Sequence, residues 1–174
     1  MELERRWKVN INDIPKYKAI NILHITQVYS SFDPDVRIRK TESDDSQIIY
    51  THTVKYFLTN NKREEFNQDI EKKSYDNIFE YINKKPVIKD RYIIPYDNYK
   101  IEVDIFKDVD KAVAEIEFSN ENEMNNFNNI PMWFGNEIKD RQSYSVKLFN
   151  LINDETKAMD LLLFKLGGDI NVQS

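Results

Sequence analysis

Charged residues spaced two apart recur along this chain, and this spacing constrains the fold more than any other feature of the sequence. Six segments carry a charged side chain at every second position, with mostly apolar residues between. Because successive side chains of a β-strand point to opposite faces, each segment is expected to form a strand with one charged and one largely apolar face. The segments cover residues 2–6, 36–39, 53–55, 88–92, 101–105 and 115–118.

Acidic and basic side chains are sorted by segment. For any one segment, a charged face open to solvent is the simpler interpretation, but such faces normally mix the two signs with uncharged polar residues. Sorting across six segments favours a closed barrel with the charged faces inside, where carboxylates converge on divalent cations and bases hold a polyanion. The bases are Arg37, Arg39, Lys55, Lys89 and Arg91, and the acids are Glu2, Glu4, Glu102, Asp104, Glu115 and Glu117.

Composition limits the chemistry. The 174 residues are 40% hydrophobic and 32% charged, which suits a single globular domain spanning 1–174. With no cysteine and two histidines, thiol chemistry, disulfides and zinc-finger spacing are excluded. Any metal must therefore be held chiefly by oxygen, which favours Mg²⁺ or Mn²⁺ over zinc.

Charge and hydropathy also limit the partners. No apolar run approaches the roughly 20 residues that cross a bilayer, and no basic-then-apolar leader precedes the first predicted strand. We therefore expect a cytoplasmic protein that does not bind membranes. A net charge of −5 argues against nucleic acid as a partner and leaves a small, densely charged anion as the expected ligand. The aromatic-rich exterior is compatible with a homodimer.

The expected fold class is α+β, with eight antiparallel strands and three helices. A tight hairpin is predicted at 96–99, Trp133 as a packing anchor and Gly135 as a turn. The helices are expected from a cap at Ser74 to about residue 84, from 119 or 120 through 127, and from 153 or 154 through 166, with an apolar stripe on the last as packing surface. The strands are expected at 2–9, 21–30, 35–41, 48–57, 63–70, 87–95, 99–107 and 112–119.

A set of short motifs in a fixed order resembles the CYTH superfamily, the triphosphate tunnel metalloenzymes. The resemblance covers nearly the whole chain and departs from the family pattern at Arg6, Val28 and Asn67, where relatives commonly have Lys, Gly and Glu. The motifs are 2–9 (ELERRWKV), 27–29 (QVY), 36–39 (VRIR), 53–55 (TVK), 63–66 (REEF), 89–92 (KDRY), 102–106 (EVDIF), 114–118 (AEIEF), 133–138 (WFGNEI) and 144–145 (YS).

This resemblance implies an eight-stranded antiparallel barrel forming a tunnel, with helices packed on the outside. It also implies divalent-cation-dependent hydrolysis of inorganic tripolyphosphate or related triphosphates. Two alternatives stay open: a class IV adenylate cyclase, which makes cyclic AMP and pyrophosphate from ATP, and a non-catalytic module that binds polyphosphate or nucleotide.

Roles for the charged residues follow as hypotheses. Glu2 and Glu4 are expected to meet Glu115 and Glu117 around a shared Mg²⁺ or Mn²⁺. Glu102 and Asp104 are expected to orient that ion or to bind a second one. The bases are expected to grip the phosphates, the arginines through forked hydrogen bonds and lysine as a point charge. They are Arg6, Arg37, Arg39, Lys55, Arg91 and, less strongly, Arg63.

Lys89 is the predicted general base for an attacking water, because neighbouring guanidiniums disfavour its charged form and lower its pKa. Tyr29 is predicted to hold or relay the proton. In the alternative, Lys89 is one more phosphate clamp and a hydroxide at the metal attacks.

Overall fold

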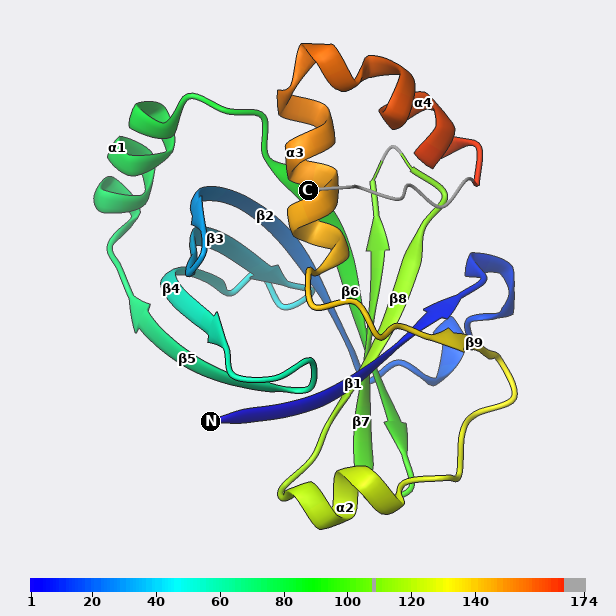
Figure 1. The fold of residues 1–174 in the computed structure, drawn as a ribbon. Coiled ribbons are helices and arrows are strands. Elements are labelled where there is room, and N and C mark those ends of the chain that lie inside the picture. Colours follow the sequence, from blue (N-terminus) through cyan, green and yellow to red (C-terminus); the bar gives the residue numbers. More distant parts are fainter. Residues whose placement is uncertain (108, 168–174) are drawn as a thin grey trace.

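A computed structural model describes residues 1–107 and 109–167 (Figure 1). It contains nine strands, four α-helices and three short 3₁₀ helices. The strands are β1 (Glu2–Val9), β2 (Asn21–Phe32), β3 (Asp35–Ser43), β4 (Ile48–Phe57), β5 (Lys62–Asp69), β6 (Val87–Tyr96), β7 (Tyr99–Phe106), β8 (Ala112–Glu117) and β9 (Phe134–Glu137). The helices are α1 (Lys72–Ile82), α2 (Glu121–Asn126), α3 (Tyr144–Asn153) and α4 (Ala158–Lys165), and the 3₁₀ helices are η1 (Ile11–Asp13), η2 (Lys16–Lys18) and η3 (Glu155–Lys157).

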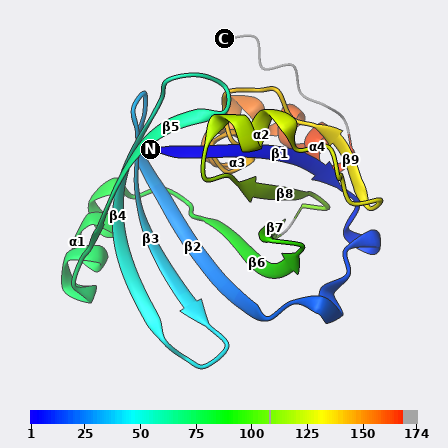
Figure 2. The ribbon, with the colours of Figure 1, turned by 90° about the horizontal axis from the view of Figure 1, so that it is seen from below.

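The first eight strands form a closed antiparallel barrel, which confirms the predicted fold. Neighbouring strands follow the order β5-β4-β3-β2-β6-β7-β8-β1, and a short pairing of β1 with β5 completes the ring (Figure 2). In that pairing Glu2 lies opposite Arg63 and Leu3 opposite Lys62. Strand β9 lies outside the ring and pairs with the far end of β1.

Most apolar side chains of the strands point outward, so much of the core lies between the barrel wall and its covering elements. On β1, Leu3, Trp7 and Val9 are buried in this outer layer. The Trp7 ring lies 6.1 Å from that of Phe127 and 4.9 Å from that of Phe134. A second apolar layer lies beneath α1, α3 and α4. The alternation on each strand therefore leaves its charged side chains to the interior.

Helix α3 packs against inward-facing rings of the barrel. Phe149 lies 5.3 Å from Tyr29, and Tyr144 lies 6.5 Å from Phe106, measured between ring centroids. Ser143 caps the helix, since its hydroxyl accepts a hydrogen bond from the amide of Val146 at 3.3 Å. The sequence interpretation did not include this helix, although Ser143 before an apolar run is a typical helix start.

The other helices differ in detail from the prediction. Ser74 lies inside α1 and does not cap it, while Asn83 ends that helix in the left-handed conformation with φ 49°. Asn120 does cap α2 by accepting from the amide of Glu123, as predicted. Asp154 caps η3, and α4 begins only at Ala158. No helix within the described residues has both the length and the apolar character to cross a membrane.

Two further predictions were wrong. The apolar stripe of the last helix is exposed to solvent in the part of the chain that the structure describes, so it is not packing surface. Gly135 lies in β9 rather than in a turn, and a Cβ at this position would come within 2.8 Å of the carbonyl oxygen of Lys8. Glycine is needed there because two backbones approach closely. The exposed stripe consists of Met159, Leu162, Leu163 and Leu166.

Candidate functional site

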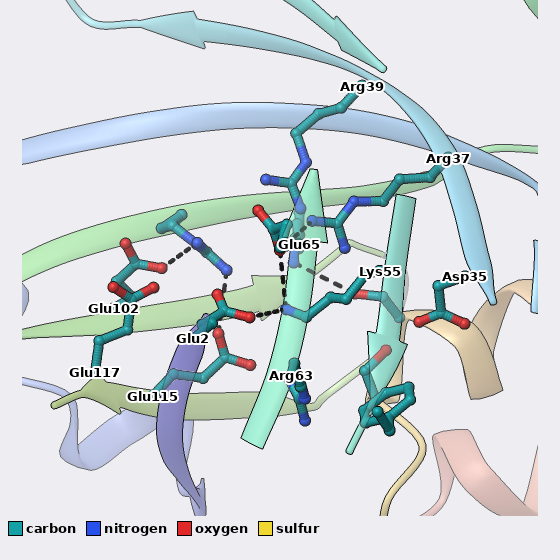
Figure 3. A pocket seen from close by; sticks show the side chains of 15 residues that line it. Glu2, Asp35, Arg37, Arg39, Lys55, Arg63, Glu65, Glu102, Glu115 and Glu117 are labelled. Carbon is teal, nitrogen blue, oxygen red and sulfur yellow. Dashed lines mark hydrogen bonds and ion pairs between the residues drawn. The ribbon is translucent and has the colours of Figure 1, made fainter. Parts of the chain in front are cut away.

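A polar cavity of about 120 Å³ lies inside the barrel and is lined almost entirely by charged side chains (Figure 3). It brings together ten of the fourteen residues predicted for the site. The other four, Glu4, Arg6, Tyr29 and Asp104, are buried and do not line it. The ten are Glu2, Arg37, Arg39, Lys55, Arg63, Lys89, Arg91, Glu102, Glu115 and Glu117.

Lys55 lies near the centre of this cavity and joins strands from opposite sides of the barrel seam. Its Nζ is 2.5 Å from Glu2 Oε2 and 3.2 Å from Glu65 Oε2. Glu65 lies directly opposite Lys55 on the neighbouring strand. Although burial opposes it, Lys55 and Arg37 lower the pKa of Glu65 to about 2. Glu65 is therefore an ionised part of the site.

Arg91 is held by three carboxylates. Its Nε and Nη2 donate to the two oxygens of Asp104 at 2.6 and 2.9 Å, Nη1 donates to Glu102, and Nη2 lies 3.4 Å from Glu115. Despite burial, Arg91 and Lys89 hold the pKa of Asp104 well below its usual range. Both oxygens of Asp104 are therefore engaged by bases, and its role toward a metal stays a prediction.

Lys89 is buried and donates hydrogen bonds to Asp104 and, at 3.3 Å, to the hydroxyl of Ser145. Its pKa is lowered to about 8, chiefly by burial, with contributions from Arg91 and Arg39 that Asp104 opposes. The direction is the predicted one, but its main cause is desolvation rather than the neighbouring guanidiniums.

The residues behind the lining form a supporting layer. Glu4 accepts a hydrogen bond from Arg63 and lies 3.4 Å from Arg6 Nε, while Arg6 donates to the carbonyl oxygen of Asp140. Burial and the neighbouring Glu115 raise the pKa of Glu4. Arg6 thus holds the barrel wall to the segment before α3, and its phosphate contact stays a prediction.

Tyr29 belongs to a hydrogen-bond chain that ends on a cavity base. Its hydroxyl accepts from Gln27 Nε2 at 2.8 Å, and Gln27 Oε1 accepts from Arg39 Nε at 3.0 Å. Burial, Arg37 and Arg91 lower the pKa of Arg39 to about 9, which leaves it cationic at neutral pH. Tyr29 therefore orients Arg39 through Gln27.

Several buried donors of the cavity arginines have no acceptor within the described part of the chain. They are Arg37 Nε and both Nε and Nη2 of Arg63. A buried charged donor without an acceptor is costly, so such groups mark a place where an anion with several oxygens would be stabilised. Phosphate matches this demand in charge and in the number of acceptors.

The carboxylates on the other side of the cavity carry excess negative charge. Glu117 lies beside Glu102 (Figure 3), and burial together with Glu102, Glu2 and Glu4 raises its pKa to about 7. Within residues 1–107 and 109–167, no three carboxylate or histidine side chains are arranged to hold a metal ion. Glu2 and Glu102 are instead paired with Lys55 and Arg91. The donors suit a hard divalent cation once those two bases exchange partners.

Comparison with known proteins places this geometry in a family. No protein-family model matches the chain. The inorganic triphosphatase of Acetivibrio thermocellus is 33% identical over 140 residues, which is 79% of this chain and 85% of that protein. The chain belongs to the CYTH superfamily of triphosphate tunnel metalloenzymes.

Solved structures show the same CYTH fold. The inorganic triphosphatase NE1496 superposes with a TM-score of 0.54 at 21% identity, covering 79% of this chain and 89% of that one. The PH1819 protein of Pyrococcus horikoshii OT3 superposes with a TM-score of 0.56 at 17% identity, covering 72% of this chain and 82% of that one. These similarities extend over most of each chain.

Within this CYTH barrel, five residues of the cavity wall were not among the predicted site residues. Asp35 precedes Arg37 by two positions, and Glu65 follows Arg63 by two, so the same period of two predicts both to point inward. Phe57 follows Lys55 by two positions on β4 and shares this signal. Ser143 and Ser145 have no such signal, because their position depends on how α3 folds over the barrel.

Proposed function

We propose that this protein is a Mg²⁺- or Mn²⁺-dependent hydrolase of inorganic tripolyphosphate or a closely related triphosphate compound. The observation that carries the proposal is the cavity itself, where arginine donors without acceptors face a group of crowded carboxylates. The name of the curated relative, an inorganic triphosphatase, supports it.

Substrate binding follows from an exchange of ion-pair partners. Lys55 is paired with Glu2, and Arg91 with Glu102. When a phosphate chain enters, these bases turn to its oxygens, while Arg37 and Arg63 supply forked donors. The carboxylates of Glu2, Glu102 and Glu117 are then free to hold the cation. Phosphate and cation should therefore bind cooperatively.

When bound, the cation would neutralise phosphate oxygens and favour deprotonation of a water. The protein's part is position, charge and proton transfer. Water attacks the terminal phosphorus, the bond to the bridging oxygen breaks, and orthophosphate and pyrophosphate leave. Lys89, whose pKa is about 8, takes the proton of that water in its neutral form. In the alternative role, Lys89 stays charged and clamps a phosphate.

A substrate panel tests the proposal. Pure protein is incubated with Mg²⁺ or Mn²⁺ and with tripolyphosphate or ATP, and orthophosphate, pyrophosphate and cyclic AMP are measured. Orthophosphate from tripolyphosphate is expected. Cyclic AMP from ATP would instead identify a cyclase, and binding without turnover in either metal would identify a binding module.

A pair of lysine variants controls for site specificity. Lys55→Ala removes the central base of the cavity and should abolish the release of orthophosphate. Lys62→Ala removes a lysine that pairs with Glu121 on the outside and should leave the rate unchanged. Equal activity in the two variants would contradict the assignment of this cavity.

A further inference from the structure

Asp35 is a buried carboxylate in the cavity wall that no sequence hypothesis included. It is the first residue of β3, lies directly opposite Lys55 and shares the inward face of Arg37. Among the described residues its side chain makes no hydrogen bond or ion pair, although Arg37, Lys55 and Arg63 act on it through space. An acid that faces three bases without pairing to any of them is free to act on a ligand.

This residue marks the boundary between two cavities. A second pocket of about 210 Å³ adjoins the first, and Asp35 and Phe57 line both. Figure 3 shows Asp35 on the far side of the basic residues from Glu102 and Glu117. The bases therefore lie between the crowded carboxylates at one end of the cavity and Asp35 with the second pocket at the other end.

The wall of the second pocket carries more acids than bases, whereas the wall of the first carries six of each. Beyond Asp35 its wall carries Asp33, Asp140 and one base, Arg141, and Asp140 is paired with Lys147. Arg141 itself donates to the carbonyl oxygen of Phe57 at 2.9 Å and lies 5.3 Å from the centroid of that ring. A chain of phosphates that continues past the cavity bases would therefore meet like charge. Such a contact is unfavourable, and burial strengthens it.

We propose that Asp35 is a specificity-determining residue that limits the phosphate chain to the length of the basic row, so that triphosphate is accepted and longer linear polyphosphates are rejected by charge. The inference rests on the proposed function, since it assumes that the phosphates lie over the cavity bases. Burial raises the pKa of Asp35 to about 6, so its carboxylate is ionised at pH 8, where the test is made.

The test compares tripolyphosphate with linear tetrapolyphosphate at pH 8. Asp35→Asn keeps the size of the side chain and removes its charge. The ratio of kcat/KM for tetrapolyphosphate to that for tripolyphosphate should rise by about tenfold or more. Asp69→Asn, the same change at an exposed position of β5, should leave the ratio as in wild type. An unchanged ratio in Asp35→Asn would overturn the proposal.

Binding separates this inference from the proposed function. If wild type hydrolyses neither compound, the proposed function fails, and isothermal titration calorimetry with the same two polyphosphates decides the inference. A tenfold rise in the relative affinity for tetrapolyphosphate in Asp35→Asn supports it, and no rise overturns it. Should that variant not fold, Asp33→Asn at the rim of the second pocket carries the test; a smaller rise is then expected, and an unchanged ratio overturns the proposal.

Discussion

Lys89 of β6 and Asp104 of β7 form an ion pair inside the barrel, with side chains 4% and 3% exposed. The same carboxylate accepts two hydrogen bonds from Arg91, which lies directly opposite it on β6. A single acid thus fixes two bases of the cavity wall at defined positions. In a barrel whose interior is charged, such pairs replace the apolar packing that positions side chains elsewhere.

Asp104→Asn should lower the free energy of unfolding by roughly 3–5 kcal/mol, because it leaves buried Lys89 without its acidic partner and removes one of the three carboxylates that hold Arg91. Urea unfolding followed by circular dichroism measures this loss. Asp90→Asn changes a surface acid of β6 that pairs with His24 and Lys107, and should cost at most about 1 kcal/mol. Similar losses of unfolding free energy in both variants would show that the buried ion pair contributes no more to stability than a surface pair.

Glu117→Gln should stabilise the metal-free protein above pH 7. Burial and neighbouring carboxylates raise the pKa of Glu117 from its ordinary value of 4.5 to about 7, so the fold favours its protonated form. In wild type, the loss of folding stability caused by ionising Glu117 is absent below pH 4.5, grows as the pH rises towards 7 and is complete above pH 7. Glutamine does not ionise, so the variant does not lose this stability. Its melting temperature, measured with chelator present, should exceed that of wild type only at the higher pH values.

The same variant should bind Mg²⁺ or Mn²⁺ about tenfold more weakly or worse, since one carboxylate oxygen ligand is lost. Isothermal titration of the metal in the presence of tripolyphosphate measures this. Glu64→Gln, on the outer side of β5, should change neither stability nor metal affinity appreciably. Unaltered metal affinity in Glu117→Gln would remove Glu117 from the proposed ligands.

Lys89→Ala should reduce kcat by about a hundredfold or more while KM changes little, if its neutral amine accepts the proton. Because the pKa of Lys89 is about 8, the wild-type rate should rise between pH 7 and 9, and this rise should vanish in the variant. Lys107→Ala, at the surface, serves as control. An equal loss in kcat and in substrate affinity would assign Lys89 to phosphate clamping.

Arg63→Ala should raise KM for tripolyphosphate roughly 10-fold to 100-fold, because it removes two buried donors that await an acceptor. Arg63→Lys keeps the positive charge but loses the forked pair of donors, so its KM should lie between those of Arg63→Ala and wild type. Circular dichroism checks that the barrel still forms, since Arg63 also holds Glu4. A KM equal to that of wild type in Arg63→Ala would show that its donors do not contact the substrate.

The barrel was predictable because most of its strands show a charged and an apolar face through alternation, and because the ordered motifs resemble a family with this fold. The short strand β9 gave no such signal: its four residues are too few to show a period, and their position depends on the close approach of Gly135 to Lys8. Helix α3 was missed although its period is present in the sequence. Lys147, Asn150 and Asn153 recur at a spacing of three, with buried apolar residues such as Val146, Leu148 and Phe149 between them. This pattern is that of an amphipathic helix.

For the site, alternation predicted which charges point inward but not which of them meet. Asp104 and Glu102 lie on the same face of β7, yet the first is fully engaged by bases while the second also faces Glu117. The strand register decides between these outcomes, and register depends on turns and bulges elsewhere in the sheet. Alternation in the sequence therefore could not predict which carboxylates hold a base and which are available to a cation.

The ring is joined between β1 and β5 over only two residue pairs, Glu2 with Arg63 and Leu3 with Lys62. Local opening of the barrel is expected first at this joint, and each opening would move Glu2 away from Lys55. Opening of this joint would therefore disturb the cavity as well as the wall. Any molecule that bridges the two strands from inside should lengthen the lifetime of the closed ring, visible as slower amide hydrogen exchange along this joint.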